Sequence, residues 1–232
     1  ELIELTYNDA LDIEFGCDNE GQLYLFQVRP ISSMVSWSNF LDEDLGGLQT
    51  SAANHFRAHS SGHPKLLGAK TIFANMSDWN PAEMIGTEPN PLALSLYQTL
   101  VGDWVWAKGR ARIGYSEIGP QPLIHSFGGR PYVDVRASLN SLLPAGLDDE
   151  IATRWVDDCI ERLRESPDLQ DKIEFDITVT CLAFDWKAKA SKMREAALSE
   201  TQISKFQRRL ASLTEKIVSS EMRPVEAELK II

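Results

Sequence analysis

Three polar residues, Glu14, Gln27 and Arg29, form a pattern that suits a magnesium-bound polyphosphate. Glu14 interrupts an apolar run on one predicted strand, and Gln27 and Arg29 stand two apart at the end of a second. Alternate residues of a strand share a face, and a tight polar turn at residues 18–21 would pair the two strands. Carboxylate and amide oxygens are hard ligands for Mg²⁺, and a guanidinium donates to phosphate oxygens. An ordinary hairpin with solvated polar residues is the alternative.

The residues around this pattern resemble the end of the ATP-grasp nucleotide-binding domain of the phosphoenolpyruvate synthase and pyruvate phosphate dikinase family. The similarity consists of D-I-E-F, a turn, and then L-Y-L-F-Q-V-R-P. Rifampin phosphotransferases share this organisation. The resemblance implies that Glu14 and Gln27 are ligands of Mg and ATP and that Arg29 contacts ATP phosphate. The step from Glu14 to Gln27 is about one residue longer than the resemblance leads us to expect, and we predict that residues 19–21 of the turn absorb it.

Two later segments also resemble bacterial phosphoenolpyruvate-synthase-like proteins. Residues 76–87, followed by P-L-A-L-S-L-Y, resemble the part downstream of the ATP-grasp domain, and G-G-R-P-Y-V-D-V-R resembles part of the central domain. The resemblance implies phosphoryl transfer from ATP to an enzyme histidine and then to an acceptor such as pyruvate. The sequence lacks the other ATP-grasp cations and the phosphohistidine motif of this family. We therefore expect an excised piece, inactive alone, that works with the remaining ATP-grasp and phosphohistidine domains of its polypeptide and a small-molecule acceptor.

Arg110 is a candidate for a substrate cleft in the region after residue 70. It lies in K-G-R-A-R-I-G-Y, a glycine-bounded segment that could receive an anionic substrate, and a solvated loop is the alternative. Three nearby polar residues have two interpretations. If they are functional, they face the substrate: Asp78, Asn80 and Glu83. On a structural interpretation they are turn and cap residues, with Asn80 capping a helix that starts at a proline.

His125 and Arg136 are two further cleft candidates, from a second predicted hairpin over residues 122–137 with a Gly-Gly turn. The valines of its second strand should face the core, which puts Asp134 and Arg136 on the opposite face. That face is either solvent or a cleft. A surface ion pair between Asp134 and Arg136, which would contribute little, is the alternative.

His55, His59 and His63 recur every four residues, so on one helix they would share a face and could bind a transition metal. Gly62 and Pro64 interrupt a helix before the third histidine, and no H-E-x-x-H pattern is present. We therefore interpret the three histidines as solvated residues of a linker.

The composition is that of a globular protein. The chain has 232 residues, of which 43% are hydrophobic and 25% charged, and its net charge is −11. The negative charge argues against a nucleic-acid surface, and no apolar run approaches the roughly 18–20 residues of a membrane span. The three cysteines are scattered without metal-ligand spacing, which predicts reduced thiols and a cytoplasmic protein.

The overall pattern predicts a predominantly helical α+β fold. We expect a C-terminal ATP-grasp hairpin over residues 1–31, a linker over 32–70, and a central domain over 71–232 with one β-hairpin and several helices. Residues 172–185 alternate like a strand but lie among helices, and helix is favoured there on that neighbourhood. A non-catalytic docking or small-molecule-binding module is the alternative function.

Two helices should carry apolar rows. One row repeats every four residues from residue 91 onward and is expected to be buried: Leu92, Leu96, Leu100 and Trp104. The other follows a 3-4-3-4 spacing over residues 199–222 and predicts a packed seam: Ile203, Phe206, Leu210, Leu213 and Ile217.

Overall fold

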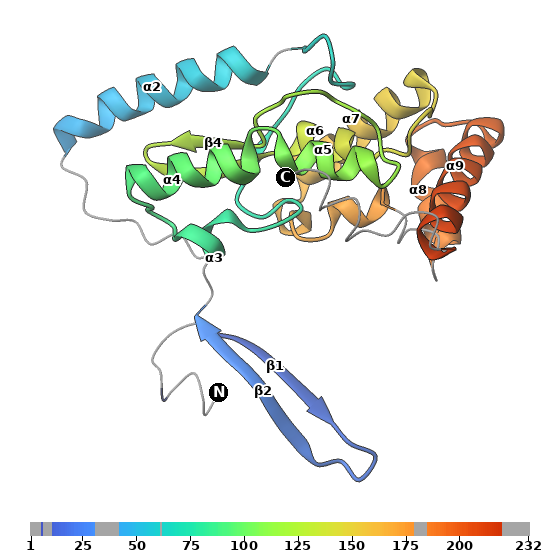
Figure 1. Ribbon diagram of the computed structural model, residues 1–232, viewed down its shortest axis with the longest axis horizontal. Helices are drawn as coiled ribbons and strands as arrows, with labels where there is room; N and C mark the ends of the chain where they lie inside the picture. Colours follow the sequence, from blue (N-terminus) through green and yellow to red (C-terminus); the bar gives the residue numbers. More distant parts are fainter. Residues whose placement is uncertain (1–5, 7–10, 31–41, 61, 179–184, 220–232) are drawn as a thin grey trace. The chain divides into compact units, whose positions relative to one another are not determined.

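The computed structural model describes residue 6 and residues 11–30, 42–60, 62–178 and 185–219 (Figure 1). The chain divides into two compact units, residues 1–39 and residues 40–232. Each unit is described by itself. Together the elements make a predominantly helical α+β fold with small antiparallel sheets, as predicted.

The first unit contains the predicted hairpin, β1 (Leu11–Cys17) paired antiparallel with β2 (Leu23–Pro30). The turn is held by the Asp18 carboxylate, which accepts hydrogen bonds from the backbone N–H groups of Glu20 and Gln22, each at 2.9 Å. The pairing shifts by one residue between Glu14 and Phe15, so β2 carries a bulge at Phe26. The extra residue is therefore accommodated in the strand, and the prediction that the turn absorbs it was wrong.

The second unit begins with α2 (Asp42–Ser60), a helix of 19 residues where we expected a linker. Gly46 and Gly47 disfavour a helix by about 1 kcal/mol each, which is why the sequence suggested a break. Packing of the C-terminal half of α2 offsets this cost. The Phe56 ring lies 5.9 Å from that of Phe73, and His55 contacts His125 of β4. Residues 32–41, at the start of the expected linker, lie outside the described residues.

A small sheet with the order β3-β5-β4 follows, made of β3 (Phe73–Ala74), β4 (Ile124–Phe127) and β5 (Arg130–Asp134). The predicted second hairpin is β4–β5, and its turn uses Gly128 and Gly129, both at positive φ. β5 ends at Asp134, whose carboxylate accepts a hydrogen bond from the Ala137 N–H and caps α6 (Val135–Ser141). Arg136 therefore belongs to a helix rather than to the strand.

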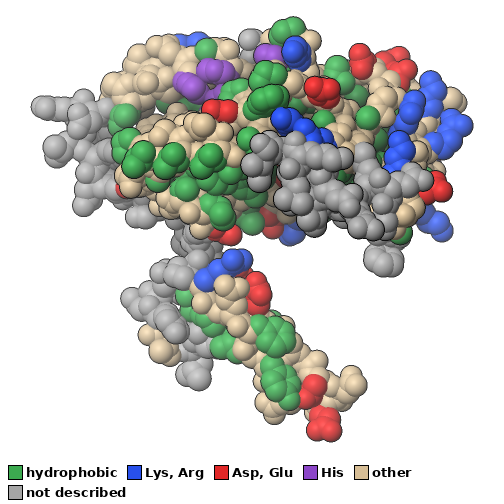
Figure 2. Space-filling view, viewed as in Figure 1, with side chains coloured by type: hydrophobic (Ala, Val, Ile, Leu, Met, Phe, Trp, Pro, Cys, Tyr) green, Lys and Arg blue, Asp and Glu red, His purple; other side chains and the backbone are tan. Residues whose placement is uncertain are grey.

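Short helices lie between β3 and β4: α3 (Pro81–Ile85), α4 (Pro91–Tyr97), the π-helix η1 (Gln98–Gly102) and α5 (Val105–Arg112). Asn80 and Asn90 cap α3 and α4 before a proline, as predicted. The apolar row that we expected to be buried is largely exposed: Leu92 68%, Leu96 50%, Leu100 64% and Trp104 47%. Figure 2 shows hydrophobic side chains gathered over α4.

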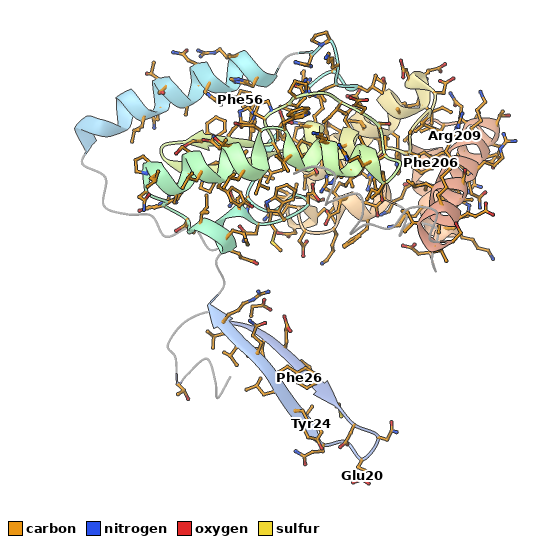
Figure 3. The ribbon with its side chains drawn as sticks, viewed as in Figure 1. Glu20, Tyr24, Phe26, Phe56, Phe206 and Arg209 are labelled. Atoms are coloured by element: carbon orange, nitrogen blue, oxygen red, sulfur yellow. The ribbon has the colours of Figure 1, made fainter. Side chains whose placement is uncertain are left out.

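The C-terminal part is helical: α7 (Asp149–Glu165), the 3₁₀ turns η2 (Pro167–Leu169) and η3 (Ile173–Asp176), α8 (Trp186–Glu195) and α9 (Glu200–Val218). The predicted seam on α9 is confirmed: Ile203, Phe206, Leu210 and Leu213 are buried, and Ile217 is partly buried against the same core (Figure 3 labels Phe206). It packs with buried residues of α6 and α7 into the main core. Within residues 172–185 the structure has the 3₁₀ turn η3 (Ile173–Asp176) instead of the expected helix, and 179–184 lie outside the described residues.

Among the described residues, no helix combines the length and the apolar character that crossing a membrane requires.

Candidate functional site

The polar face of the β1–β2 hairpin carries all three residues predicted to bind Mg and ATP. Glu14 lies directly opposite Gln27, and Arg29 lies directly opposite Asp12. Directly opposed residues have Cβ atoms about 5 Å apart on the same face. The two oxygen ligands predicted for Mg²⁺ are therefore neighbours, with the guanidinium next along the same face.

Arg29 already has an anionic partner within the hairpin. Its Nε and Nη2 atoms both lie 2.8 Å from Oδ2 of Asp12, and the two side chains are 43% and 48% exposed. An exposed pair of this kind contributes about 0–1 kcal/mol, so a phosphate can compete for the guanidinium at little cost.

The hairpin also exposes large apolar side chains. Phe26, at the bulge, lies over Gly16, where an added Cβ would be 2.7 Å from the ring (Figure 3). Several large apolar residues of the hairpin are more than half exposed: Phe15, Leu23, Tyr24, Leu25 and Phe26. A two-stranded hairpin with this much exposed apolar surface is marginal in water without further packing.

Arg110 is held inside the second unit by specific partners. Its guanidinium donates to Asp78 at 2.5 Å and to the Ser141 hydroxyl at 2.7 Å, and it lies over the rings of Trp79 and Trp106. Asp78 adopts a positive φ of 83° and also accepts from Ser138. The structure thus pairs two residues that the sequence had singled out separately, in an arrangement that orders a loop.

Arg136 is almost fully buried, at 1% exposure, which does not fit a residue lining an open cleft. Its guanidinium donates to the backbone carbonyls of Gly68 and His59, so it anchors the end of α2. Asn80 and Glu83 hydrogen-bond to each other, and Asn80 caps α3, which agrees with the structural interpretation.

Two surface pockets of the second unit are lined by other residues. One lies between α5 and the following loop, and the other lies between the start of α7 and α9. Neither is lined by Arg110, His125 or Arg136, so these pockets do not supply the cleft predicted for the three residues.

His125 lies instead in a cluster with His55 and His59 that the sequence did not predict. One ring nitrogen from each histidine lies within 4.8 Å of the other two. His55 Nε2 and His125 Nδ1 are 2.9 Å apart, and the His55 and His59 rings are stacked with centroids 4.2 Å apart. His63, which we had grouped with the first two, lies outside the cluster and accepts a hydrogen bond from the Lys65 N–H.

The surroundings favour the neutral form of His55 and His125 in this cluster. Burial, and then the neighbouring His59 and His55, lower the pKa of His125 to about 4. Burial and then His59 also lower the pKa of His55. Rings that stay neutral near pH 7 keep a lone pair on one nitrogen, which is the form that binds metal ions.

Comparisons of the chain with known protein families, with curated proteins and with solved structures give no match. The family resemblance of residues 11–30 stays a prediction based on its sequence motifs.

Proposed function

We propose that the hairpin is one wall of a Mg–ATP site in a larger phosphotransferase similar to phosphoenolpyruvate synthase. Glu14 and Gln27 would ligate the magnesium ion, and Arg29 would hold ATP phosphate. The observation that carries the proposal is the strand register, which opposes Glu14 to Gln27 and Asp12 to Arg29 on one face. The bulge at Phe26 supports it, since bulges re-aim side chains next to active sites.

On this proposal the chain does not complete the reaction by itself. Phosphoryl transfer also needs cations that cradle the phosphates and a group that receives the phosphoryl. The remaining ATP-grasp strands would supply the cations, and a histidine of another domain would carry the phosphoryl to an acceptor such as pyruvate. The exposed apolar residues of the hairpin would then be covered by the rest of the ATP-grasp domain.

Removing either charged ligand should weaken ATP binding and turnover in the full-length protein. A hydrogen bond to a charged group contributes about 1.5–3 kcal/mol, so Arg29→Ala should lower ATP turnover by roughly 10- to 100-fold. Glu14→Ala removes a charged ligand of the magnesium ion and should lower ATP turnover at least as much. Glu20→Ala is the matched control, because Glu20 is an exposed carboxylate in the turn of the same hairpin and should change turnover little. Unchanged ATP turnover in both ligand variants would show that the site assignment is wrong.

A docking module is the second candidate function, and the exposed apolar row over α4 and η1 favours it. Isolated exposed apolar residues are ordinary, but a contiguous row indicates a surface that another protein surface covers. Leu92, Leu96 and Leu100 are each at least half exposed in this chain. The remaining domains of the same polypeptide are the partner that we propose for this row.

Amide hydrogen exchange tests this second candidate. Exchange at residues 91–102 should be slower in the full-length protein than in this chain, because a docked domain protects the backbone beneath it. The buried seam of α9 serves as the internal control and should exchange equally in both. Equal exchange at residues 91–102 would exclude docking on this row.

A further inference from the structure

The three clustered histidines come from two elements that meet in the second unit. His55 and His59 are four residues apart on α2, so they project from the same face one turn apart. His125 lies on β4 and is 4% exposed. The rings of Phe73 and Phe127 pack beside them, with Phe127 5.1 Å from His55 and Phe73 4.9 Å from His125. The cluster is therefore bordered by apolar rings.

The hydrogen bond of His59 determines which of its nitrogens is available. Its Nδ1 lies 2.8 Å from the backbone carbonyl oxygen of His55, and a carbonyl only accepts, so Nδ1 carries the proton. The lone pair is then on Nε2. A histidine oriented in this way through one nitrogen presents the other to a metal ion.

A carboxylate lies behind His125, slightly beyond hydrogen-bond distance. The Nδ1 atom of His125 lies 2.9 Å from Nε2 of His55. Its Nε2 atom is buried and lies 4.0 Å from Oδ2 of Asp134. Asp134 is itself fixed, because its Oδ1 accepts from the Thr71 hydroxyl at 2.7 Å and from the Ala137 N–H at 2.9 Å. A shift of the His125 ring by less than about 1 Å toward Asp134 would form the hydrogen bond from the histidine to the carboxylate that orients metal-binding histidines.

We propose that His55, His59 and His125 bind a zinc ion, with Asp134 orienting His125. Three imidazole nitrogens suit a borderline ion such as Zn²⁺ and not the hard cations Mg²⁺ and Ca²⁺. Three protein ligands leave the fourth tetrahedral position to a water molecule. Its ligands all belong to the second unit, whereas the residues proposed to bind the nucleotide belong to the first.

The spacing of the nitrogens is close to what zinc requires. Zn–N bonds of about 2.0–2.1 Å in a tetrahedron place ligand nitrogens about 3.3 Å apart. His55 Nε2 and His125 Nδ1 are 2.9 Å apart, and one ring nitrogen from each of the three histidines lies within 4.8 Å of the other two. Ring rotations that move atoms by roughly an ångström therefore close the site. Without metal, a hydrogen bond between two neutral rings explains the His55–His125 contact, and this is the alternative that the experiment must exclude.

A bound ion would fix α2 to the sheet. The contacts that hold this part of α2 include the histidine cluster, the Phe56–Phe73 ring pair and the Arg136 guanidinium on the His59 carbonyl. Zinc would add bonds from two residues of α2 and one of β4. The expected consequence is slower amide exchange over residues 50–60 when zinc is present.

The test uses the untagged chain, stripped of metal with a chelator and titrated with ZnCl₂ in a calorimeter. We expect one zinc ion per chain. His59→Ala should weaken binding by more than about 100-fold, since loss of an orienting partner alone costs roughly 10- to 100-fold. Asp134→Asn keeps an acceptor for the cap of α6 and should weaken binding by roughly 10- to 100-fold. Cobalt in place of zinc should give the visible absorption of a tetrahedral Co²⁺ site.

His63→Ala is the matched control, because His63 is the remaining histidine of the chain and lies outside the cluster. It should bind zinc like the unaltered chain. Cys17→Ser should also bind zinc normally, which excludes the exposed Cys17 thiol as a ligand. Circular dichroism of each variant confirms that it is folded. The absence of stoichiometric zinc binding, or binding that survives His59→Ala, would overturn the proposal.

Discussion

Replacing Asp176 with asparagine should lower the free energy of unfolding by about 3 kcal/mol at neutral pH. Its carboxylate is 3% exposed and is contacted by three cations of α7 and α8. Lys189 Nζ lies 2.5 Å from Oδ1, Arg162 Nη1 2.7 Å from Oδ2, and Lys192 Nζ 3.0 Å from Oδ2. Asparagine preserves the shape and removes the charge, so the three cations lose their shared counter-ion.

The size of this effect follows from the burial of the groups involved. Removing one partner of a buried ion pair costs about 3–5 kcal/mol, because the other charge is left without compensation. Here the cations are 11%, 23% and 39% exposed, so they recover part of their hydration. We therefore expect a value at the lower end of that range. Urea unfolding of the two proteins at pH 7 measures it.

The pH dependence of the same pair of proteins gives a second measurement. Burial by itself raises the pKa of Asp176, but hydrogen bonds from Lys189 and Arg162 outweigh burial and leave the pKa below its ordinary value of 3.8. A carboxyl group with a lowered folded-state pKa contributes stability that is complete above the unfolded-state pKa and is lost as the pH falls through the folded-state value. The difference between the proteins should be constant above about pH 5 and shrink below about pH 4.

Asp185→Asn is the matched control for Asp176→Asn. Asp185 contacts the same lysine, with Oδ2 3.1 Å from Lys189 Nζ, but its side chain is 51% exposed. An exposed ion pair contributes at most about 1 kcal/mol, so this variant should unfold at nearly the same urea concentration as the unaltered protein. Equal effects of the two substitutions would contradict a special role for the buried carboxylate.

Features with a local physical cause could be predicted from the sequence. Asn80 and Asn90 before prolines predicted the starts of α3 and α4, because the cap and the fixed φ of proline act within a few residues. The Gly128–Gly129 pair predicted the β4–β5 turn for the same reason. The face shared by Gln27 and Arg29 also followed from strand alternation. The alignment of Glu14 with Gln27 depends on the bulge at Phe26, which the sequence did not predict.

Features that depend on distant contacts could not be predicted. His55 and His125 are 70 residues apart, and no local pattern marks them as neighbours. Gly62 and Pro64 indicated that a helix would end before His63, and α2 does end at Ser60, but nothing in the spacing of the three histidines pointed to His125. The alternation at residues 173–177 likewise predicted a regular element, but tertiary contacts of Asp176 with α7 and α8 stabilise a 3₁₀ turn there.

The two apolar rows show why spacing predicted one buried face and not the other. Residues of an α-helix are about 100° apart, so a repeat of four advances by about 40° at each step. In a continuous α-helix the row from Leu92 to Trp104 would drift in this way, but η1 is a π-helix, and all four side chains are 47–68% exposed, so they form one exposed row that the described chain does not cover. The 3-4-3-4 spacing of α9 alternates the direction of drift, which keeps Ile203, Phe206 and Leu210 on one side.

Truncating one leucine from each row tests this difference directly. Leu210 on α9 is 0% exposed, so Leu210→Ala should lower the free energy of unfolding by about 2–5 kcal/mol through lost burial and a cavity. Leu100 on η1 is 64% exposed, so Leu100→Ala should change it by no more than about 0.5 kcal/mol. Leucine and alanine have similar helix propensities, so the difference between the two variants reports burial.

Urea unfolding at two protein concentrations is the measurement. A large cost for Leu100→Ala that grows with concentration would show that the row is covered by a second copy of the chain, and a large cost independent of concentration would show that the row is buried within one chain.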